Sequence, residues 1–120
     1  MSSPAAKSPL RSVVASLKGS ARVPGDKSIS HRALMLSSQA PGSTRITGLL
    51  EGEDVLATAK ALAHLGVSLK RTDTSEWLVN GNLPGHLRES ADVLDMGNSG
   101  TSPRLLMGLV TPYPFPTFFT

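Results

Sequence analysis

Apolar and polar residues alternate along this chain with two different periods, and the three- to four-residue period of an amphipathic helix is the clearer one. It predicts a helix from about Ile29 to Gln39, capped by the side chain of Asp26 or Ser28 and ended by Pro41-Gly42. The apolar stripe of this helix consists of Ile29, Ala33, Leu36 and Ala40, and Leu34 and Met35 widen it. Because the stripe is wide, we expect the helix to be buried on more than one side.

The same period predicts two further helices. One has an apolar face of Val55, Leu56, Ala59, Leu62 and Ala63, and Gly66 is predicted to end it as the C′ residue. The acids before it, Glu51, Glu53 and Asp54, are interpreted as negative charges that favour a helix N-terminus. The other helix follows the segment Gly97-Asn98-Ser99-Gly100 and runs through Leu109.

Segments with strand character lie before and between these helices. They are Val13–Val23 (broken near Gly19 and stopped by Pro24-Gly25), Thr44–Leu50, Val67–Arg71, Glu76–Val79 and Val93–Met96. The third and fourth segments flank a turn at Thr72–Ser75, which predicts a hairpin. The resulting order, β-α-β-α-β-β and then β-α, indicates an α/β fold in which helices layer on sheet with right-handed crossovers, and its restart suggests a structural repeat.

This order divides the chain into three parts: a flexible basic leader at residues 1–18, a first βαβαββ unit at 19–88, and the start of a second unit at 89–120. The leader is Ser-rich and free of acids, which superficially fits an organelle transit peptide. It is short, however, so a bacterial leader and a cytoplasmic location are preferred to a plastid. The tail Thr111–Thr120 mixes prolines with aromatic rings and is expected to lack a partner, as in a chain that has been cut short.

Composition excludes several classes of function. The 120 residues contain no cysteine, so disulfides, thiolate zinc sites and a thiol nucleophile are absent. No apolar run reaches the length of a membrane span. The formal net charge is only +3, and the early basic residues lack the aromatic partners that nucleic-acid binding uses, so we expect neither membrane nor nucleic acid as a partner.

The first segment with candidate chemistry runs from Val23 to Ala33. On a helix that begins near Ser28, residues Ser28 and Arg32 share a face, and Lys27 stands beside the free backbone N–H groups of the helix end. Two cations and a helix N-terminus can bind a polyanion. Spacing alone leaves the alternative open that Lys27 and Arg32 are ordinary solvated charges.

The second candidate segment, Gly97-Asn-Ser-Gly-Thr-x-x-Arg104, is a glycine-rich turn that opens a helix. Backbone N–H groups can approach a phosphate or carboxylate closely in such a turn. The alternative is a capped helix start in which glycine serves tight packing. Pro103 is acceptable only in the first turn of the helix, so the helix is predicted to begin at or after Ser99.

These segments resemble one known family. Pro24-Gly-Asp-Lys-Ser-Ile-Ser-His-Arg32 is similar to the signature P-G-[SD]-K-S-x-[ST]-x-R of the shikimate-pathway enolpyruvyl transferases. Gly48-Leu-Leu-Glu-Gly-Glu-Asp-Val55 and Asp95-Met-Gly-Asn-Ser-Gly-Thr101 match further segments of the family in the same order. The chain is therefore identified as resembling the N-terminal part of a 5-enolpyruvylshikimate-3-phosphate synthase.

The resemblance implies roles for particular residues. Lys27 would contact both substrates and act in catalysis, and Ser28 and Arg32 would bind shikimate 3-phosphate. Asn98, Gly100 and Arg104 would lie at the phosphoenolpyruvate site, which the inhibitor glyphosate would share. A side chain at position 100 would then crowd that site. No metal or organic cofactor is implied.

The resemblance also implies an architecture and a reaction. The fold would be a βαβαββ unit of an inside-out α/β barrel, truncated in its second unit. The enolpyruvyl group of phosphoenolpyruvate would pass to the 5-hydroxyl of shikimate 3-phosphate. Further active-site residues would come from the remaining C-terminal part of the same enzyme, so we expect the chain alone to be inactive and to bind anions weakly.

Two alternatives remain. The related UDP-N-acetylglucosamine enolpyruvyl transferases carry Asn-Ala-Ala after the lysine and typically rely on a cysteine, unlike Ser28–Arg32 here. A non-catalytic phosphate-binding or structural module is the other. The histidines His31, His64 and His86 lack the spacing of metal ligands and are interpreted as structural.

Overall fold

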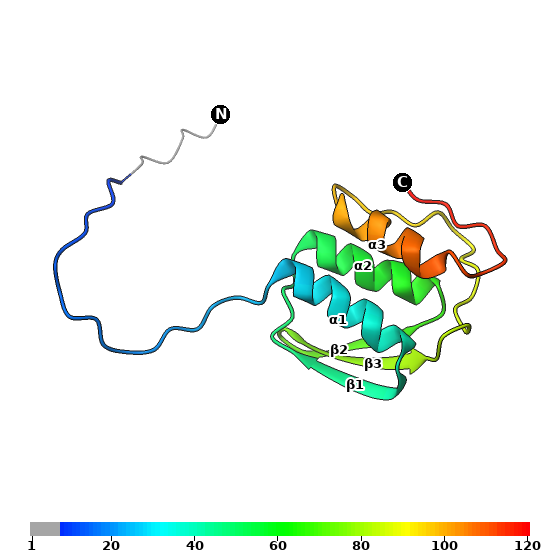
Figure 1. Cartoon of the computed structure of the whole chain (residues 1–120), viewed down its shortest axis with the longest axis horizontal. Helices are drawn as coiled ribbons and strands as arrows, with labels where there is room; N and C mark the ends of the chain where they lie inside the picture. Colours follow the sequence, from blue (N-terminus) through cyan, green and yellow to red (C-terminus); the bar gives the residue numbers. More distant parts are fainter. Residues whose placement is uncertain (1–7) are drawn as a thin grey trace.

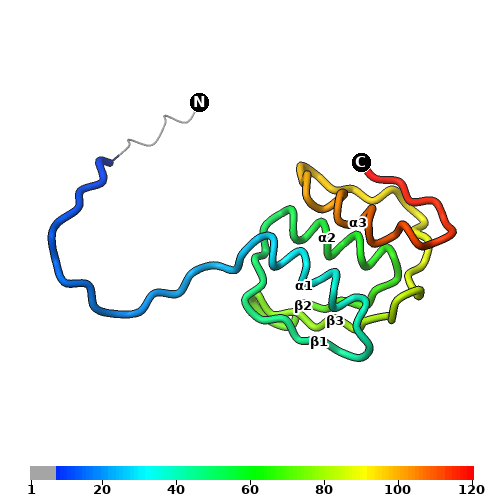
Figure 2. Tube along the Cα trace, in the orientation of Figure 1, coloured from blue at the N-terminus to red at the C-terminus, as the bar shows by residue number. Residues whose placement is uncertain are grey.

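A computed structural model describes residues 8–120 of the chain. Its helices are α1 (Lys27–Gln39), α2 (Glu53–His64) and α3 (Thr101–Val110), and its strands are β1 (Pro41–Thr47), β2 (Ser68–Asp73) and β3 (Glu76–Asn82). Figure 1 shows α1 and α2 covering one face of the sheet, with α3 packed on the helices rather than on the sheet. The trace in Figure 2 shows the segment before α1 leading away from this layered body.

The sheet has the strand order β1-β3-β2, and both pairs are antiparallel. Strands β2 and β3 form the predicted hairpin, whose turn is completed by Ser75 at a positive φ of 55°. The chain crosses from β1 at one edge to β2 at the other through α2, since β3 lies between them. The end of α1 crosses close over β3, and a Cβ at Gly81 would stand 1.7 Å from the Ala40 carbonyl oxygen.

Local sequence signals set the helix boundaries. Of the two capping residues considered, Asp26 is the one that caps α1, because its carboxylate accepts a hydrogen bond from the Ile29 N–H at 2.8 Å. Gly66 ends α2 at a positive φ of 91°, as predicted for a C′ residue. The N–H groups of Gly66 and Val67 bond to the carbonyls of Ala63 and Leu62, each at 3.0 Å, which is the Schellman pattern.

The N-terminal ends of all three helices lie at the same end of the molecule (Figure 1). Side-chain contacts agree with this arrangement, because Lys27 at the start of α1 pairs with Asp54 at the start of α2. Thr58 of α2 also bonds to Ser102 at the start of α3. Three positive helix-dipole ends therefore gather at one end of the layer.

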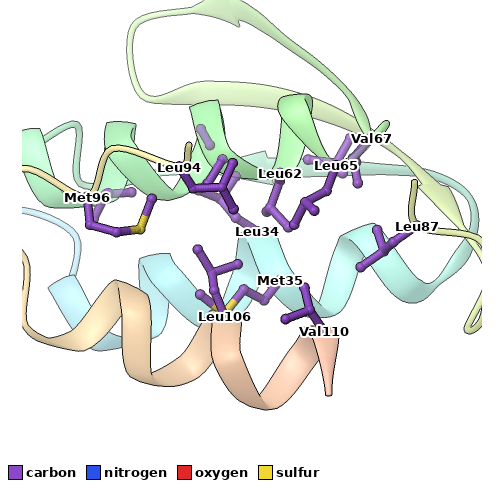
Figure 3. Close-up of a cluster of buried hydrophobic side chains, with 14 of the residues drawn as sticks. Leu34, Met35, Leu62, Leu65, Val67, Leu87, Leu94, Met96, Leu106 and Val110 are labelled. Atoms are coloured by element: carbon purple, nitrogen blue, oxygen red, sulfur yellow. The ribbon is translucent and has the colours of Figure 1, made fainter. Parts of the chain in front are cut away.

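The core lies between the sheet and the helices and continues between the helices themselves (Figure 3). It consists of Leu34, Met35, Leu49, Val55, Ala59, Ala61, Leu62, Leu65, Val67, Val79, Leu87, Leu94, Met96, Leu106 and Val110. These are aliphatic and methionine side chains, as a sequence with 4% aromatic residues requires. The wide stripe of α1 is only partly buried: Leu34 and Met35 are in the core, whereas Ile29 and Leu36 are exposed.

The strand predicted at Val13–Val23 is absent, and this prediction was wrong. Residues 8–26 carry no strand in the described structure, and the side chains of Val13, Val14 and Val23 are exposed. A strand is stabilised by the ladder of hydrogen bonds to its neighbours, and this segment has no neighbouring strand among the described residues. Of the predicted leader, residues 8–18 are exposed and lack regular structure, and residues 1–7 lie outside the described part.

The expectation that the tail lacks a partner was also wrong. Leu94 pairs in parallel with Phe119, so the segment predicted as a strand at Val93–Met96 forms a single bridge with the tail rather than an extended strand. The Leu94 N–H bonds to the Phe118 carbonyl at 2.8 Å and the Thr120 N–H to the Leu94 carbonyl at 3.0 Å. Tyr113, Phe115 and Phe119 pack against the core.

The observed elements confirm the mixed α/β class, with helices layered on a small sheet. Within residues 8–120, none of the helices has both the length and the apolar character required to cross a membrane.

Candidate functional site

The signature segment Pro24–Arg32 is packed directly against the family segment Gly48–Val55. Gly25, just before α1, lies so close to the loop after β1 that a Cβ would be 2.1 Å from the Gly48 carbonyl oxygen. Ser30, buried on α1, accepts a hydrogen bond from the Leu50 N–H at 3.0 Å and donates to the Asp26 carbonyl at 2.7 Å. The head of α1 is therefore held in place by the Gly48–Leu50 backbone.

Lys27 is the first residue of α1, and its ammonium forms an ion pair with the carboxylate of Asp54. The Lys27 side chain is 51% exposed and that of Asp54 23% exposed, so the ammonium is held at the surface of the helix ends. Asp54 was interpreted as a charge that favours its own helix, and it does lie in the first turn of α2. Its pairing with Lys27 was not predicted from the sequence.

Ser28 and Arg32 are exposed on successive turns of α1, as the i and i+4 spacing predicts. The Arg32 guanidinium donates from Nη1 to the Ser28 carbonyl oxygen at 3.1 Å. This bond keeps the guanidinium near the N-terminal turn and leaves its other N–H groups without a hydrogen-bond partner among the described residues. Ser28 and Arg32 can therefore face a ligand at the head of α1.

The glycine turn before α3 has the predicted form. Gly97 adopts a positive φ of 55°, and its N–H bonds to the Asp95 carboxylate at 2.8 Å. Asn98 and Gly100 are exposed, and Gly100 is the N-cap residue of α3 with a φ of −86°. Gly100 has no side chain to cap this helix, but Ser99 Oγ accepts from the Ser102 N–H at 3.1 Å, and Pro103 has no N–H. The N–H groups of Gly100 and Thr101 are therefore the ones that remain available to an anion.

Arg104 folds back over this turn, because its Nη1 donates to the Gly100 carbonyl oxygen at 2.6 Å. A Cβ at Gly100 would meet the same Nη1 at 3.1 Å. The crowding expected from a side chain at position 100 therefore falls first on the Arg104 guanidinium. Pro103 is the third residue of α3, which begins at Thr101, so it lies in the first turn where a missing N–H is harmless, as predicted.

Beneath this surface, four buried side chains connect the helices through hydrogen bonds, and we call them the buried polar chain: His31, Thr58, Ser102 and Ser99. His31 Nδ1 lies 2.8 Å from Thr58 Oγ1. Thr58 donates to Ser102 Oγ at 2.9 Å, and Ser102 Oγ lies 2.7 Å from Ser99 Oγ. Ser102 also donates to the carbonyl oxygen of Asp54 at 3.3 Å. Sequence reasoning missed this chain because its members look like unrelated small polar residues.

Glu51 differs from the sequence interpretation. It does not favour a helix N-terminus, because its carboxylate accepts two bonds from Arg71, at 2.7 and 3.0 Å, and one from Trp77 Nε1 at 2.9 Å. The hydrogen bonds from Arg71 and Trp77 lower the pKa of Glu51 from 4.5 to about 2. This cluster anchors the loop before α2 to the sheet, and Glu51 takes no part in the gathering at the helix ends.

The histidines differ in environment. His31 is fully buried, and burial together with the nearby Lys27 ammonium lowers the pKa of His31 below 6.5. His86 is exposed in a loop, with Nδ1 3.2 Å from the Pro84 carbonyl oxygen. Across residues 8–120 there is no group of three or more His, Asp or Glu side chains suited to hold a metal ion.

The arrangement thus brings together the residues that the sequence singled out. Lys27, Ser28 and Arg32 lie at the head of α1, and Gly97–Gly100 and Arg104 lie at the head of α3. Asp54 connects the two groups, since its carboxylate pairs with Lys27 and its carbonyl accepts from Ser102. Three exposed cations and three helix N-termini at one end can hold more than one anionic group at once.

Comparison with known proteins points to one family. The sequence model of EPSP synthase (3-phosphoshikimate 1-carboxyvinyltransferase) matches residues 12–120. A 3-phosphoshikimate 1-carboxyvinyltransferase of Paramagnetospirillum magneticum is 60% identical over 106 residues, which are 88% of this chain and 24% of that protein. The same enzyme of Sphingopyxis alaskensis is 55% identical over 103 residues, 86% of this chain and 23% of that protein.

Solved structures agree. The EPSP synthase of Acinetobacter baumannii superposes with a TM-score of 0.80 at 45% identity, over 85% of this chain and 23% of that one. This chain therefore spans about a quarter of the length of the relatives that it matches. Because the family model covers nearly all of the sequence and the fold agrees, the chain belongs to the EPSP synthase family.

Proposed function

We propose that this chain carries the N-terminal share of the substrate site of an enolpyruvyl transferase. The observation that supports the proposal is the convergence of two anion-binding segments, at the heads of α1 and α3, on one end of the helix layer. The reaction is the one named for the relatives, 3-phosphoshikimate 1-carboxyvinyl transfer.

The substrate roles divide between the two segments. Ser28 and Arg32 bind the phosphate of shikimate 3-phosphate, through a hydroxyl and a planar guanidinium fork. Asn98, Gly100 and Arg104 bind phosphoenolpyruvate at the open N-terminus of α3, where glyphosate also binds. Lys27, at the head of α1 and paired with Asp54 of α2, is a compact charge that contacts both substrates.

The chemistry requires two polyanions to be held side by side. The 5-hydroxyl oxygen of shikimate 3-phosphate forms a bond to C2 of phosphoenolpyruvate while a proton adds to C3. The hydroxyl proton then passes to a base. Inorganic phosphate leaves C2 of the tetrahedral intermediate, and the C3 methyl group loses a proton to a base, so the C2=C3 double bond forms again. Fixed cations and helix N-termini offset the repulsion between the substrates and align them. Binding energy is used in this way to lower the activation barrier of the reaction.

Lys27 must change partner for this role. In the structure its ammonium is paired with Asp54, so a bound phosphate either displaces that carboxylate or shares the ammonium with it. Because Lys27 is half exposed, the ion pair is a weak competitor, of roughly 0–1 kcal/mol. The pair thus holds the ammonium in position without withholding it from a dianion.

The remaining active-site groups belong to the part of the enzyme beyond this quarter. We therefore expect the chain alone to bind anions weakly, to show no turnover, and to work in the cytoplasm when joined to the rest. Association with that C-terminal part completes the cleft.

Titrations of the ¹⁵N-labelled chain with shikimate 3-phosphate and with phosphoenolpyruvate test the proposal. The amide signal of Ser28 is expected to move with shikimate 3-phosphate, that of Gly100 with phosphoenolpyruvate, and that of Lys27 with both. Lys27→Met should weaken the response, whereas Lys70→Met, at an exposed lysine on β2, serves as the matched control. Signals at both helix heads that stay fixed at millimolar ligand would refute it in favour of a structural module.

A further inference from the structure

The donor and acceptor at the His31 end of the buried polar chain follow from the protons that each group carries. Thr58 has one hydroxyl proton, and its acceptors are Ser102 Oγ at 2.9 Å and the Asp54 carbonyl oxygen at 3.4 Å. Thr58 therefore has no proton for His31, and the contact of 2.8 Å requires His31 Nδ1–H to be the donor. In neutral His31 the proton is then on Nδ1 and Nε2 is bare, which agrees with Nε2 being buried without a partner among the described residues.

These hydrogen bonds connect the position of α1 to the position of the glycine turn. Ser102 Oγ accepts from Thr58 and lies within reach of Ser99 Oγ, and the Ser102 N–H bonds to Ser99 Oγ at 3.1 Å. Ser99 stands inside the turn, next to Gly100, and is itself buried. At the other end, His31 immediately precedes Arg32 on α1.

We propose that His31 is a positioning residue, which acts through the hydroxyls of Thr58 and Ser102 to fix the glycine turn Gly97–Gly100 relative to the head of α1. The inference rests on the proposed function for its purpose, since two substrates that react must be held at a set separation. It rests on the buried polar chain for its geometry. His31 itself does not touch substrate.

The proposal explains why this imidazole remains neutral. A proton on Nε2 would create a buried donor without an acceptor. It would also place a positive charge near two cations of the same helix, Lys27 and Arg32. The charged groups around His31 are Lys27 and Arg32 on α1 and Asp54 on α2, and α3 contributes only hydroxyls in the described part of the chain. Burial and Lys27 lower the pKa of His31, so the imidazole is neutral at neutral pH and Nδ1–H remains the donor to Thr58.

Protonation of His31 should therefore disturb the turn through Thr58. The test uses the 120-residue chain without substrate, and follows the amide signals of Ser99, Gly100 and Thr101 from about pH 7.5 to about pH 5. These signals are expected to follow the titration of His31, with a midpoint below 6.5. A long-range ¹H–¹⁵N spectrum of the imidazole reports its tautomer directly.

The variants separate positioning from packing. Thr58→Val keeps the volume but removes the link, so His31 should still titrate while the turn signals no longer follow it. Thr58→Ser restores a hydroxyl and should restore the coupling. Ser38→Ala removes an equally buried hydroxyl that bonds within α1 at the Met35 carbonyl, and should leave the coupling intact.

Two results would overturn the proposal. One is an imidazole protonated at Nε2 at neutral pH, and the other is a turn that follows His31 equally well in Thr58→Val. Because neither readout uses a ligand, the result does not depend on whether shikimate 3-phosphate binds. Titration with the two substrates adds a separate arm: the response of Gly100 to phosphoenolpyruvate should fall in Thr58→Val, while the response of Ser28 to shikimate 3-phosphate persists.

Discussion

The contact between Gly25 and Gly48 makes the sharpest prediction about how the site is held together. Gly25→Ala would place a Cβ 2.1 Å from the Gly48 carbonyl oxygen and 3.0 Å from the Leu50 nitrogen. Both neighbours are backbone atoms, and the Leu50 N–H is already bonded to Ser30. The strain cannot be relieved by rotating a side chain, so α1 and the Gly48–Leu50 loop must separate.

The cost follows from two terms. Overpacking of a fitted contact costs about 1–3 kcal/mol. Loss of the bond between Leu50 and Ser30 adds about 0.5–1.5 kcal/mol. Gly25→Ala should therefore lower the free energy of unfolding by roughly 2–4 kcal/mol, a large fraction of the stability of a small domain. The same separation would move Lys27 away from Asp54.

Urea unfolding measures this cost, with the single tryptophan, Trp77 on β3, as the fluorescent probe. The matched control is Gly108→Ala, because a Cβ at Gly108 in α3 meets nothing within 4 Å. That change should raise stability by up to about 1 kcal/mol, through helix propensity. A Gly25→Ala chain within about 0.5 kcal/mol of wild type would refute the close approach of the two segments.

Four further predictions concern the site and its surroundings. Asp54→Asn frees the Lys27 ammonium and should tighten phosphate binding by about two- to fivefold, as measured by calorimetry; unchanged or weaker binding would show that the pair does not compete. The pKa of His31 is lower in the folded chain than its ordinary 6.5, so the unfolded state binds the proton better and stability should fall as pH drops below about 6.5. His31→Gln should remove that part of the pH dependence in urea unfolding, and a curve that keeps it would locate the effect elsewhere. Glu51 should titrate near pH 2 rather than 4.5, so the Trp77 emission should change only in strong acid, and Glu51→Gln should abolish the step; a step near pH 4.5 would contradict the Arg71 and Trp77 bonds. Gly100→Ala should shift the Arg104 guanidinium signals in ¹⁵N spectra while it costs under about 1 kcal/mol in stability, because the contact at 3.1 Å falls on a flexible side chain; an unmoved Arg104 would argue against that contact.

The environment of His31 links stability and function in this chain. The residue lies in the first signature but at a position that sequence reasoning treated as merely structural. Its burial and its bond to Thr58 are structural features, yet they connect two segments that carry the proposed substrate contacts. Thr58 is uncharged and lies outside the three signature segments, yet its hydroxyl connects His31 to Ser102 and so helps to set the geometry of the site.

The sequence alone determined the features that depend on residues close in the chain. The end of α2 at Gly66 and the β2-β3 hairpin follow from short-range hydrogen bonds and backbone preferences, and the same preferences limited the cap of α1 to Asp26 or Ser28. The family could be recognised from three signature segments, since their residue types and order suffice. The tolerance of Pro103 followed in the same way, from its position in the first turn of α3.

Only the tertiary structure decided which distant groups meet. The sequence around Val13–Val23 does not show whether a partner strand is present. Glu51 fitted the pattern of an acidic residue at a helix N-terminus, and only the structure shows that its carboxylate binds Arg71 and Trp77. The partners of Lys27 and His31 come from α2, beyond the reach of periodicity. Propensity and capping act over a few residues, whereas packing and buried hydrogen bonds join residues that the chain keeps far apart, so their pairing is fixed only when the layers assemble.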